Sequence, residues 1–196
     1  VFCPGLCYFD SPMKRPVPDQ DTIAALATAP GPGAISVIRV SGPEALELAA
    51  QLFRGKQDPR AMKPFTLAHG WLEENGERID EVLCLVMHAP GSYTREQVIE
   101  FHCHGGIAAA GRALEAVLRA GARPAAPGEF TRRAFLAGRL DLAQAEAVAD
   151  LIASQTAAAA RAAAIQLEGG LSRELHEIRA DLAEMLARLE AGIDFA

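Results

Sequence analysis

The distribution of proline divides this sequence into two parts. All 12 prolines lie at or before Pro127, and alanine and leucine dominate the residues that follow. Proline disrupts helix interiors because it lacks a backbone N–H and its ring clashes with the preceding turn. The proline-free part is therefore predicted to be helical, whereas the earlier part, with short apolar runs between glycine and proline turns, predicts strands and loops. The predicted fold class is α+β: a small mixed-sheet α/β domain followed by a partial all-α domain.

The first residues carry no periodic pattern. Their apolar stretch is interrupted by proline, glycine and aspartate, and no basic residues precede it. This pattern is not typical of a signal peptide. Met13 precedes a basic pair and resembles a natural first residue, so we expect residues 1–12 to come from an upstream start or an added extension. The predicted organisation is a disordered or upstream extension over 1–20, the α/β domain over 21–138, and the first helices of a truncated helical domain over 139–196.

Charge and cysteine content narrow the function classes. Acidic residues outnumber basic ones 25 to 19, which argues against unaided binding of nucleic acid through phosphates, although a local basic patch stays possible. The cysteines Cys3, Cys7, Cys84 and Cys103 are too irregularly spaced for a disulfide framework or a CxxC motif. No apolar window approaches the roughly 20 residues that span a bilayer. We expect a cytoplasmic protein with no membrane partner.

Apolar runs bounded by turn residues predict the strands of the first domain. The pair Asn75–Gly76 is the strongest short signal for a hairpin. The run 79–87 is apolar on both faces, which predicts a central strand. The predicted strands are 22–28 and 34–40 around the PGPG turn, 65–72 and 79–87 around the hairpin, and 98–104.

Helix starts are predicted from capping boxes and glycines. Ser41 with Glu44 predicts a helix that ends at Gly55, and Thr94 with Gln97 predicts a short helical turn. Further helices are predicted from Gly105–Gly106 to about Ala120, over 128–137, and from the capping box of Asp141 and Gln144 as one long helix up to Gly169–Gly170.

The last helix carries an apolar seam with alternating spacings of four and three, as in a coiled coil. It can pack on its own domain, or it can belong to a truncated bundle; the scarcity of other helices favours the second, so we expect the seam to be exposed. The seam consists of Leu171, Leu175, Ile178, Leu182, Met185 and Leu189.

The segment EFHCHGG places two histidines on one face of a predicted strand. His102 and His104 have a spacing that can chelate a metal, but no third ligand accompanies them, so hydrogen bonds within the domain are favoured. A nucleophilic pair with Cys103 is disfavoured because adjacent strand residues point apart.

Three charged residues are candidates for a binding site. Glu100 follows an apolar run, where a carboxylate is costly without a partner; it is either a solvated residue at a sheet edge or a ligand-binding group. Arg39 ends an apolar strand and either pairs with a carboxylate or offers its fork to a ligand. Arg139 lies between two predicted helices and, taken alone, is an ordinary charge at a helix C-terminus.

No GxxxxGK[ST] loop occurs, so the sequence shows no nucleotide triphosphate site. Four segments, in this order, resemble the successive signatures of the MnmE/TrmE family of tRNA modification GTPases. These segments are DTIAALATAPGPGAISVIRVSG, SYTREQVIEFHCHGG, PGEFTRRAFLAGRLDLAQAEAVADLI and EAGIDF.

The resemblance implies an α/β domain that forms a homodimer and binds a tetrahydrofolate derivative (5-formyl or methylene), and then a helical domain interrupted by a GTPase domain. In the family, an MnmG/GidA-type flavoprotein partner helps to add an aminomethyl or carboxymethylaminomethyl group at C5 of the wobble uridine (U34) of tRNA. The implied cofactor-binding residues are Arg39, Glu100 and Arg139, the last in place of a family lysine. GTP, Mg and K would bind only in the GTPase domain, which this sequence lacks, and no catalytic or metal residue is expected here.

Two alternatives belong to other classes. A stand-alone folate-dependent one-carbon transferase would need an acid or base near the folate, and His102 or His104 are the candidates. A structural dimerisation module without folate is made conceivable by the change to Arg139.

Overall fold

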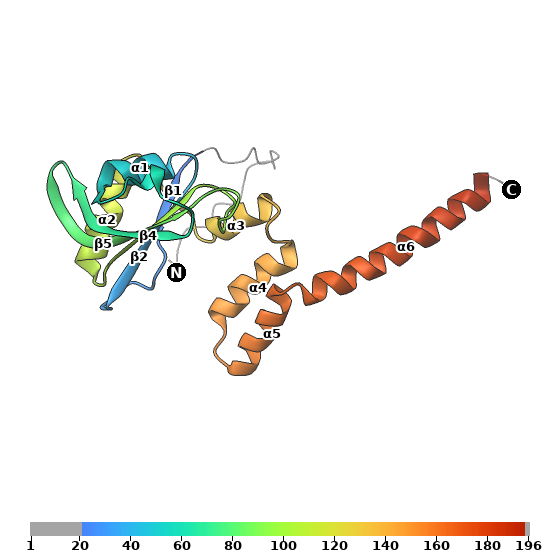
Figure 1. Cartoon of the computed structure of the whole chain (residues 1–196). Helices are drawn as coiled ribbons and strands as arrows, with labels where there is room; N and C mark the ends of the chain where they lie inside the picture. The colour runs from blue at the N-terminus through green and yellow to red at the C-terminus, as the bar shows by residue number, and fades with distance from the viewer. Residues whose placement is uncertain (1–20, 195–196) are drawn as a thin grey trace, which may run out of the picture. The chain divides into compact units, whose positions relative to one another are not determined.

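A computed structural model describes residues 21–194. The predictions for residues 1–20, including Cys3 and Cys7, lie outside the described residues. The chain separates into two compact units, the first ending at Arg139 and the second beginning at Leu140, and each is described by itself (Figure 1).

The first unit is built on one mixed seven-stranded sheet with the order β3-β4-β5-β6-β2-β1-β7. The pair β1 and β7 is parallel, and all other neighbours are antiparallel. This confirms the predicted fold class. The strands are β1 (Ile23–Leu26), β2 (Ile35–Ser41), β3 (Phe53–Gly55), β4 (Thr66–Glu74), β5 (Glu77–Met87), β6 (Val98–His104) and β7 (Arg123–Pro124).

Two helices, α1 (Ala45–Leu52) and α2 (Ile107–Arg119), cover one face of this sheet (Figure 1). Alternate residues of each strand point to opposite faces. In β5, Val82 is buried in the core, whereas Leu83 on the other face is 41% exposed. The strand is central, as predicted, but only one of its faces is buried. The other face of the sheet is only partly covered: Ile35 of β2 and Leu83 of β5 are exposed there, whereas Ser41 and Val98 are buried. A short 3₁₀ turn, η1 (Pro59–Ala61), and α3 (Glu129–Leu136) complete the unit.

Several local predictions are confirmed. The predicted strand 98–104 is β6. The hairpin between β4 and β5 turns at Asn75 and Gly76, both with positive φ (51° and 83°), as a type I′ turn requires. Helix α2 starts after Gly106, whose φ of 136° is suited to glycine.

The predicted capping box at Ser41 is wrong. Ser41 is the last residue of β2, and its hydroxyl hydrogen-bonds to Thr94 (2.7 Å) and donates to Glu96 (2.6 Å). Helix α1 begins at Ala45. The backbone N–H of Glu44, which has no partner within the helix, donates to the hydroxyl of Thr22 (2.9 Å). A tertiary partner far along the chain has replaced the local cap.

Two further local predictions are wrong in the first unit. Helix α1 ends at Leu52, because Phe53–Gly55 pairs with β4 as an edge strand. The segment around Thr94 and Gln97 forms no helical turn; the Thr94 side chain is buried against Ser41, and Gln97 binds His88. In both cases contacts with distant residues override the local signal.

The second unit contains α4 (Leu142–Ala153), α5 (Ala157–Leu167) and α6 (Gly170–Asp194). The capping box of Asp141 and Gln144 is confirmed, with both reciprocal hydrogen bonds present. The prediction of one long helix up to Gly169 is wrong. The chain breaks after α4, and the Thr156 side chain caps the new helix α5 by accepting from Ala159 N–H (3.1 Å).

The seam of α6 is exposed, as predicted. Its large apolar side chains range from 44% exposed at Leu171 to 66% at Leu189. None of the helices within residues 21–194 combines the length and the apolar character needed to cross a lipid bilayer.

Candidate functional site

The candidate site is centred on an ion pair between two neighbouring inner strands. Arg39 of β2 lies directly opposite Glu100 of β6 in the register. Arg39 Nε and Nη2 each lie 2.7 Å from Glu100 Oε1. The Glu100 side chain is 11% exposed and that of Arg39 is 30% exposed. Glu100 is therefore not a solvated residue at a sheet edge, and its buried charge is compensated by Arg39.

The second oxygen of this carboxylate is less occupied. Glu100 Oε2 has one described contact, with His102 Nε2 at 3.4 Å, which is long for a hydrogen bond. An ionised carboxylate offers about four acceptor positions, so Glu100 can still accept N–H groups from a ligand. Arg39, Glu100 and His102 lie on the same face of the sheet, and the partly exposed Arg39 and His102 leave a ligand access to them.

Aromatic side chains surround the Arg39 guanidinium. Its Cζ lies 5.9 Å from the ring centroid of Tyr93 and 5.7 Å from that of Phe130. The Tyr93 hydroxyl is hydrogen-bonded to Thr131 of α3 (3.0 Å). These contacts restrict the guanidinium and attract its charge to the ring faces. Arg39 is thus fixed by an ion pair and two rings.

Arg139 reaches the same aromatic ring. Its Cζ lies 4.7 Å from the Tyr93 centroid. Arg39 and Glu100 are in direct contact, and Arg139 joins them through Tyr93. Arg39 and Arg139 therefore lie against one ring in the first unit, and Glu100 is joined to them through its ion pair with Arg39. Beside it, a surface pocket of about 470 Å³ is lined by Tyr93, Phe65 and Arg139, among others.

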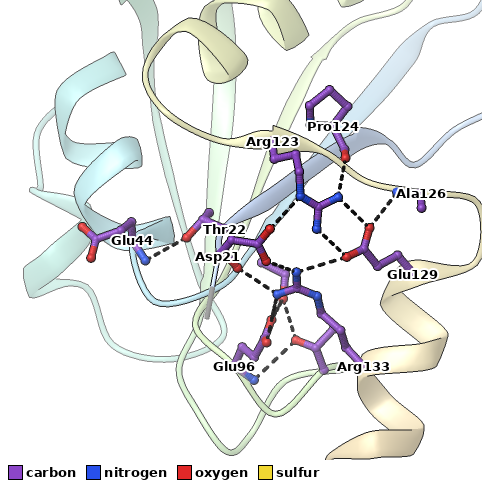
Figure 2. Close-up of polar contacts among 11 residues, drawn as sticks. Asp21, Thr22, Glu44, Glu96, Arg123, Pro124, Ala126, Glu129 and Arg133 are labelled. Carbon is purple, nitrogen blue, oxygen red and sulfur yellow. Dashed lines mark hydrogen bonds and ion pairs between the residues drawn. The ribbon is translucent and has the colours of Figure 1, made fainter. Parts of the chain in front are cut away.

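A charge network with Arg133 and Glu129 buried at its centre, shown in Figure 2, lies in the same segments of the chain as Tyr93 and Phe130. Arg133 of α3 has a side chain only 4% exposed and forms ion pairs with Asp21, Glu96 and Glu129. Arg123 pairs with Glu129 at 2.7 Å and with Asp21 at 2.6 Å. The network joins the start of β1, the loop before β6, β7 and α3.

The network changes the acidity of its carboxyl groups. Hydrogen bonds from Arg123, then from the backbone N–H of Ala126 and from Arg133, lower the pKa of Glu129 to about 2 against the opposing effect of burial. Hydrogen bonds from Arg123 and then Arg133 likewise lower the pKa of Asp21 to about 2. These carboxylates are therefore ionised at neutral pH, and protonating them at low pH removes the stabilisation that their ion pairs provide.

The histidines and cysteines have structural partners. His104 lies 2.7 Å from Asp80, which raises the pKa of this histidine. Burial raises the pKa values of Cys84 and Cys103 to about 12, so both are unreactive thiols. Among residues 21–194, no three His, Cys, Asp or Glu side chains gather in a manner suited to a metal ion.

Sequence reasoning missed Tyr93, Phe130 and Arg133. Arg133 stands one helical turn after Glu129, a spacing typical of an ion pair, but nothing local distinguishes it from a solvated surface pair. Tyr93 stands in a loop without periodicity, and its role depends on which arginines the fold brings beside it.

Comparison with protein families matches both units. Residues 22–139 match the family described as "GTP-binding protein TrmE N-terminus", and residues 142–196 match the "MnmE helical domain". The two matches meet close to the boundary between the units.

Curated relatives extend this result. Proteins named tRNA modification GTPase MnmE are 52% identical over 183 residues in Symbiobacterium thermophilum, 51% over 180 in Moorella thermoacetica and 48% over 175 in Listeria welshimeri. These matches cover 89–90% of this chain, but the chain spans only 38–39% of the length of the relatives. The chain belongs to the MnmE/TrmE family, with its N-terminal domain followed by a segment of its helical domain.

Proposed function

We propose that the first unit binds a reduced folate, and that it does so as part of a protein that modifies tRNA. The observation that carries the proposal is the ion pair between the half-buried Arg39 and the buried Glu100, with Glu100 Oε2 still able to accept hydrogen bonds. The 2-amino group and ring N–H of a pterin are two adjacent donors, which match the acceptor positions of a carboxylate. Arg39 and Arg139 suit the pterin carbonyl or the carboxylates of the folate.

The residues present fit such a group. Arg39 compensates the Glu100 charge before any ligand arrives and orients the carboxylate, and Tyr93 and Phe130 hold Arg39 in turn. Preorganised groups of this kind lose little conformational freedom on binding. A bound 5-formyl or methylene tetrahydrofolate would supply the one-carbon unit.

The wider role follows from the names of the relatives, which are tRNA modification GTPases. In this proposal the protein forms a homodimer through the first unit. It acts in the cytoplasm with an MnmG/GidA-type flavoprotein on the wobble uridine (U34) of tRNA. GTP, Mg and K would bind in the portion of the relatives that this chain does not span. The exposed seam of α6 would pack against helices from that portion.

The test is the substitution Glu100→Gln. It removes a charge-assisted hydrogen-bond acceptor, worth roughly 1.5–3 kcal/mol, and should weaken binding of 5-formyltetrahydrofolate about tenfold or more in calorimetry. Glu115→Gln is the matched control, because Glu115 is an exposed α2 residue paired with Arg119. Unchanged affinity in Glu100→Gln would remove this carboxylate from the site.

The same titration separates the alternatives. Absence of any heat with the unsubstituted chain favours a structural dimerisation module. Turnover of reduced folate by the chain alone favours a stand-alone one-carbon transferase, with His102 beside Glu100 as its candidate acid or base.

A further inference from the structure

The pocket beside Tyr93 contains two arginines without carboxylate partners. Most arginines of the first unit form ion pairs, among them Arg60, Arg119 and Arg133. Arg95 and Arg139 have none among residues 21–194, yet both line this one pocket of about 470 Å³. None of its described lining residues is acidic. In a chain with an excess of acidic residues, two neighbouring unpaired guanidinium groups mark a place suited to an anion.

Each guanidinium is positioned from the protein side. Arg95 Nη1 donates to the Ala137 carbonyl at 3.2 Å, close to the end of α3. Arg139 lies over the Tyr93 ring at 4.7 Å. Each contact uses only part of the guanidinium, which carries five N–H donors. The remaining donors are available for carboxylate oxygens, which this fork geometry recognises.

The same pocket also offers an apolar aromatic surface. Phe65 is 65% exposed although it is a large apolar residue, and it lines the pocket with Met87. Phe65 and Arg95 both have positive φ (59° and 61°), which is uncommon for such bulky residues. Local backbone strain of this kind is concentrated at ligand-binding positions. The pocket therefore combines an aromatic wall with two cations.

We propose that Arg95 and Arg139 form a subsite for the tail of the folate, a benzoyl ring bearing glutamate carboxylates. The ring packs against Phe65, and the carboxylates pair with the two guanidinium groups. This inference rests on the proposed function, in which Arg39 and Glu100 bind the pterin end. Tyr93 contacts both Arg39 and Arg139 and so connects the two ends of the site. It follows that the site distinguishes a glutamate-bearing folate from its tailless analogue.

Calorimetry with two ligands tests the subsite: 5-formyltetrahydrofolate, and 5-formyltetrahydropteroate, which lacks the glutamate. The unsubstituted 196-residue chain should bind the tailed ligand about tenfold more tightly, since two charge-assisted pairs are lost without the tail. Higher salt should reduce this advantage. The substitution Arg95→Gln keeps a side chain at the strained position and should weaken only the tailed ligand, by about fivefold or more.

Arg112→Gln is the matched control, because Arg112 is an exposed arginine on α2 that pairs with Glu77 away from this pocket. It should change neither affinity. Equal weakening of both ligands in Arg95→Gln, or no weakening of either, would overturn the tail subsite and leave the pterin site standing. If neither ligand binds the unsubstituted chain, the proposed function fails and the subsite fails with it.

Discussion

Charged side chains are usually exposed and large apolar side chains are usually buried, and each unit of this chain departs from one half of this rule. The first unit buries charges, with Arg133 4% exposed and Glu129 3% exposed. Helix α6 of the second unit exposes large apolar side chains along its whole seam. Each feature is costly by itself. In the first unit, ion pairs within the chain offset the free-energy cost of burying charges. No side chains among residues 21–194 pack over the apolar seam of α6. The buried charges of the first unit thus have charged partners, whereas the seam of α6 has no apolar partner among residues 21–194.

The largest expected effect tests the buried ion pairs of the first unit. Arg133→Met leaves Asp21, Glu96 and Glu129 without a common partner, and breaking a buried pair in this way costs about 3–5 kcal/mol of unfolding free energy. Trp71 of β4 is the only tryptophan, so its fluorescence during urea unfolding reports this unit alone. Arg119→Met, which removes an exposed arginine, should leave the midpoint nearly unchanged. Equal midpoints for the two variants would contradict the role given to the network.

A smaller effect on stability is expected when the pH is lowered. The pKa of Glu129 is about 2 in the folded chain, against 4.5 for its ordinary value. A lowered pKa stabilises the fold fully above about pH 4.5, and this contribution is lost as the pH falls towards 2. It amounts to at most about 3 kcal/mol. The urea midpoint followed through Trp71 should therefore fall over this range, and less steeply in Glu129→Gln. Parallel pH profiles would speak against Glu129 as a source of the dependence.

The smallest effect is expected in the seam. Leu182 is 60% exposed, so Leu182→Ala should change stability by less than about 0.5 kcal/mol. Ile99→Ala in β6 is the matched comparison, because Ile99 is fully buried and its truncation leaves a cavity costing about 2–5 kcal/mol. Helix content by circular dichroism should survive Leu182→Ala, since alanine is a strong helix former. A large loss of helix would mean that the seam is already packed.

The sequence predicted those parts of the fold in which the deciding contacts are local. The turn at Asn75–Gly76 and the capping box of Asp141 and Gln144 depend on neighbouring residues. Strand β6 was predicted from the alternation within its own segment, although it pairs with β2 and β5. Ser41 failed as a cap because its partners, Thr94 and Glu96, lie more than 50 positions away. Strand β3 was missed because it exists only by pairing with β4.

The candidate site shows the same division. Arg39 and Glu100 were each identified as costly charges in apolar strands, but their pairing depends on the register between β2 and β6. That register is set by the packing of the whole sheet. Arg133 could not be identified from the sequence, because its partner Asp21 is 112 positions away. Composition and local pattern reveal which residues need partners, and the fold decides which partners they receive.

Arg39 and Glu100 face each other only in the correct register of β2 and β6, so ligand binding at the proposed site would report that register. Shifting β2 by a single position against β6 would turn the arginine towards the helix-covered core and separate it from the carboxylate. Misaligned molecules would then lack the proposed binding surface. The number of ligands bound per chain would therefore measure the fraction of molecules in which the sheet has the correct register.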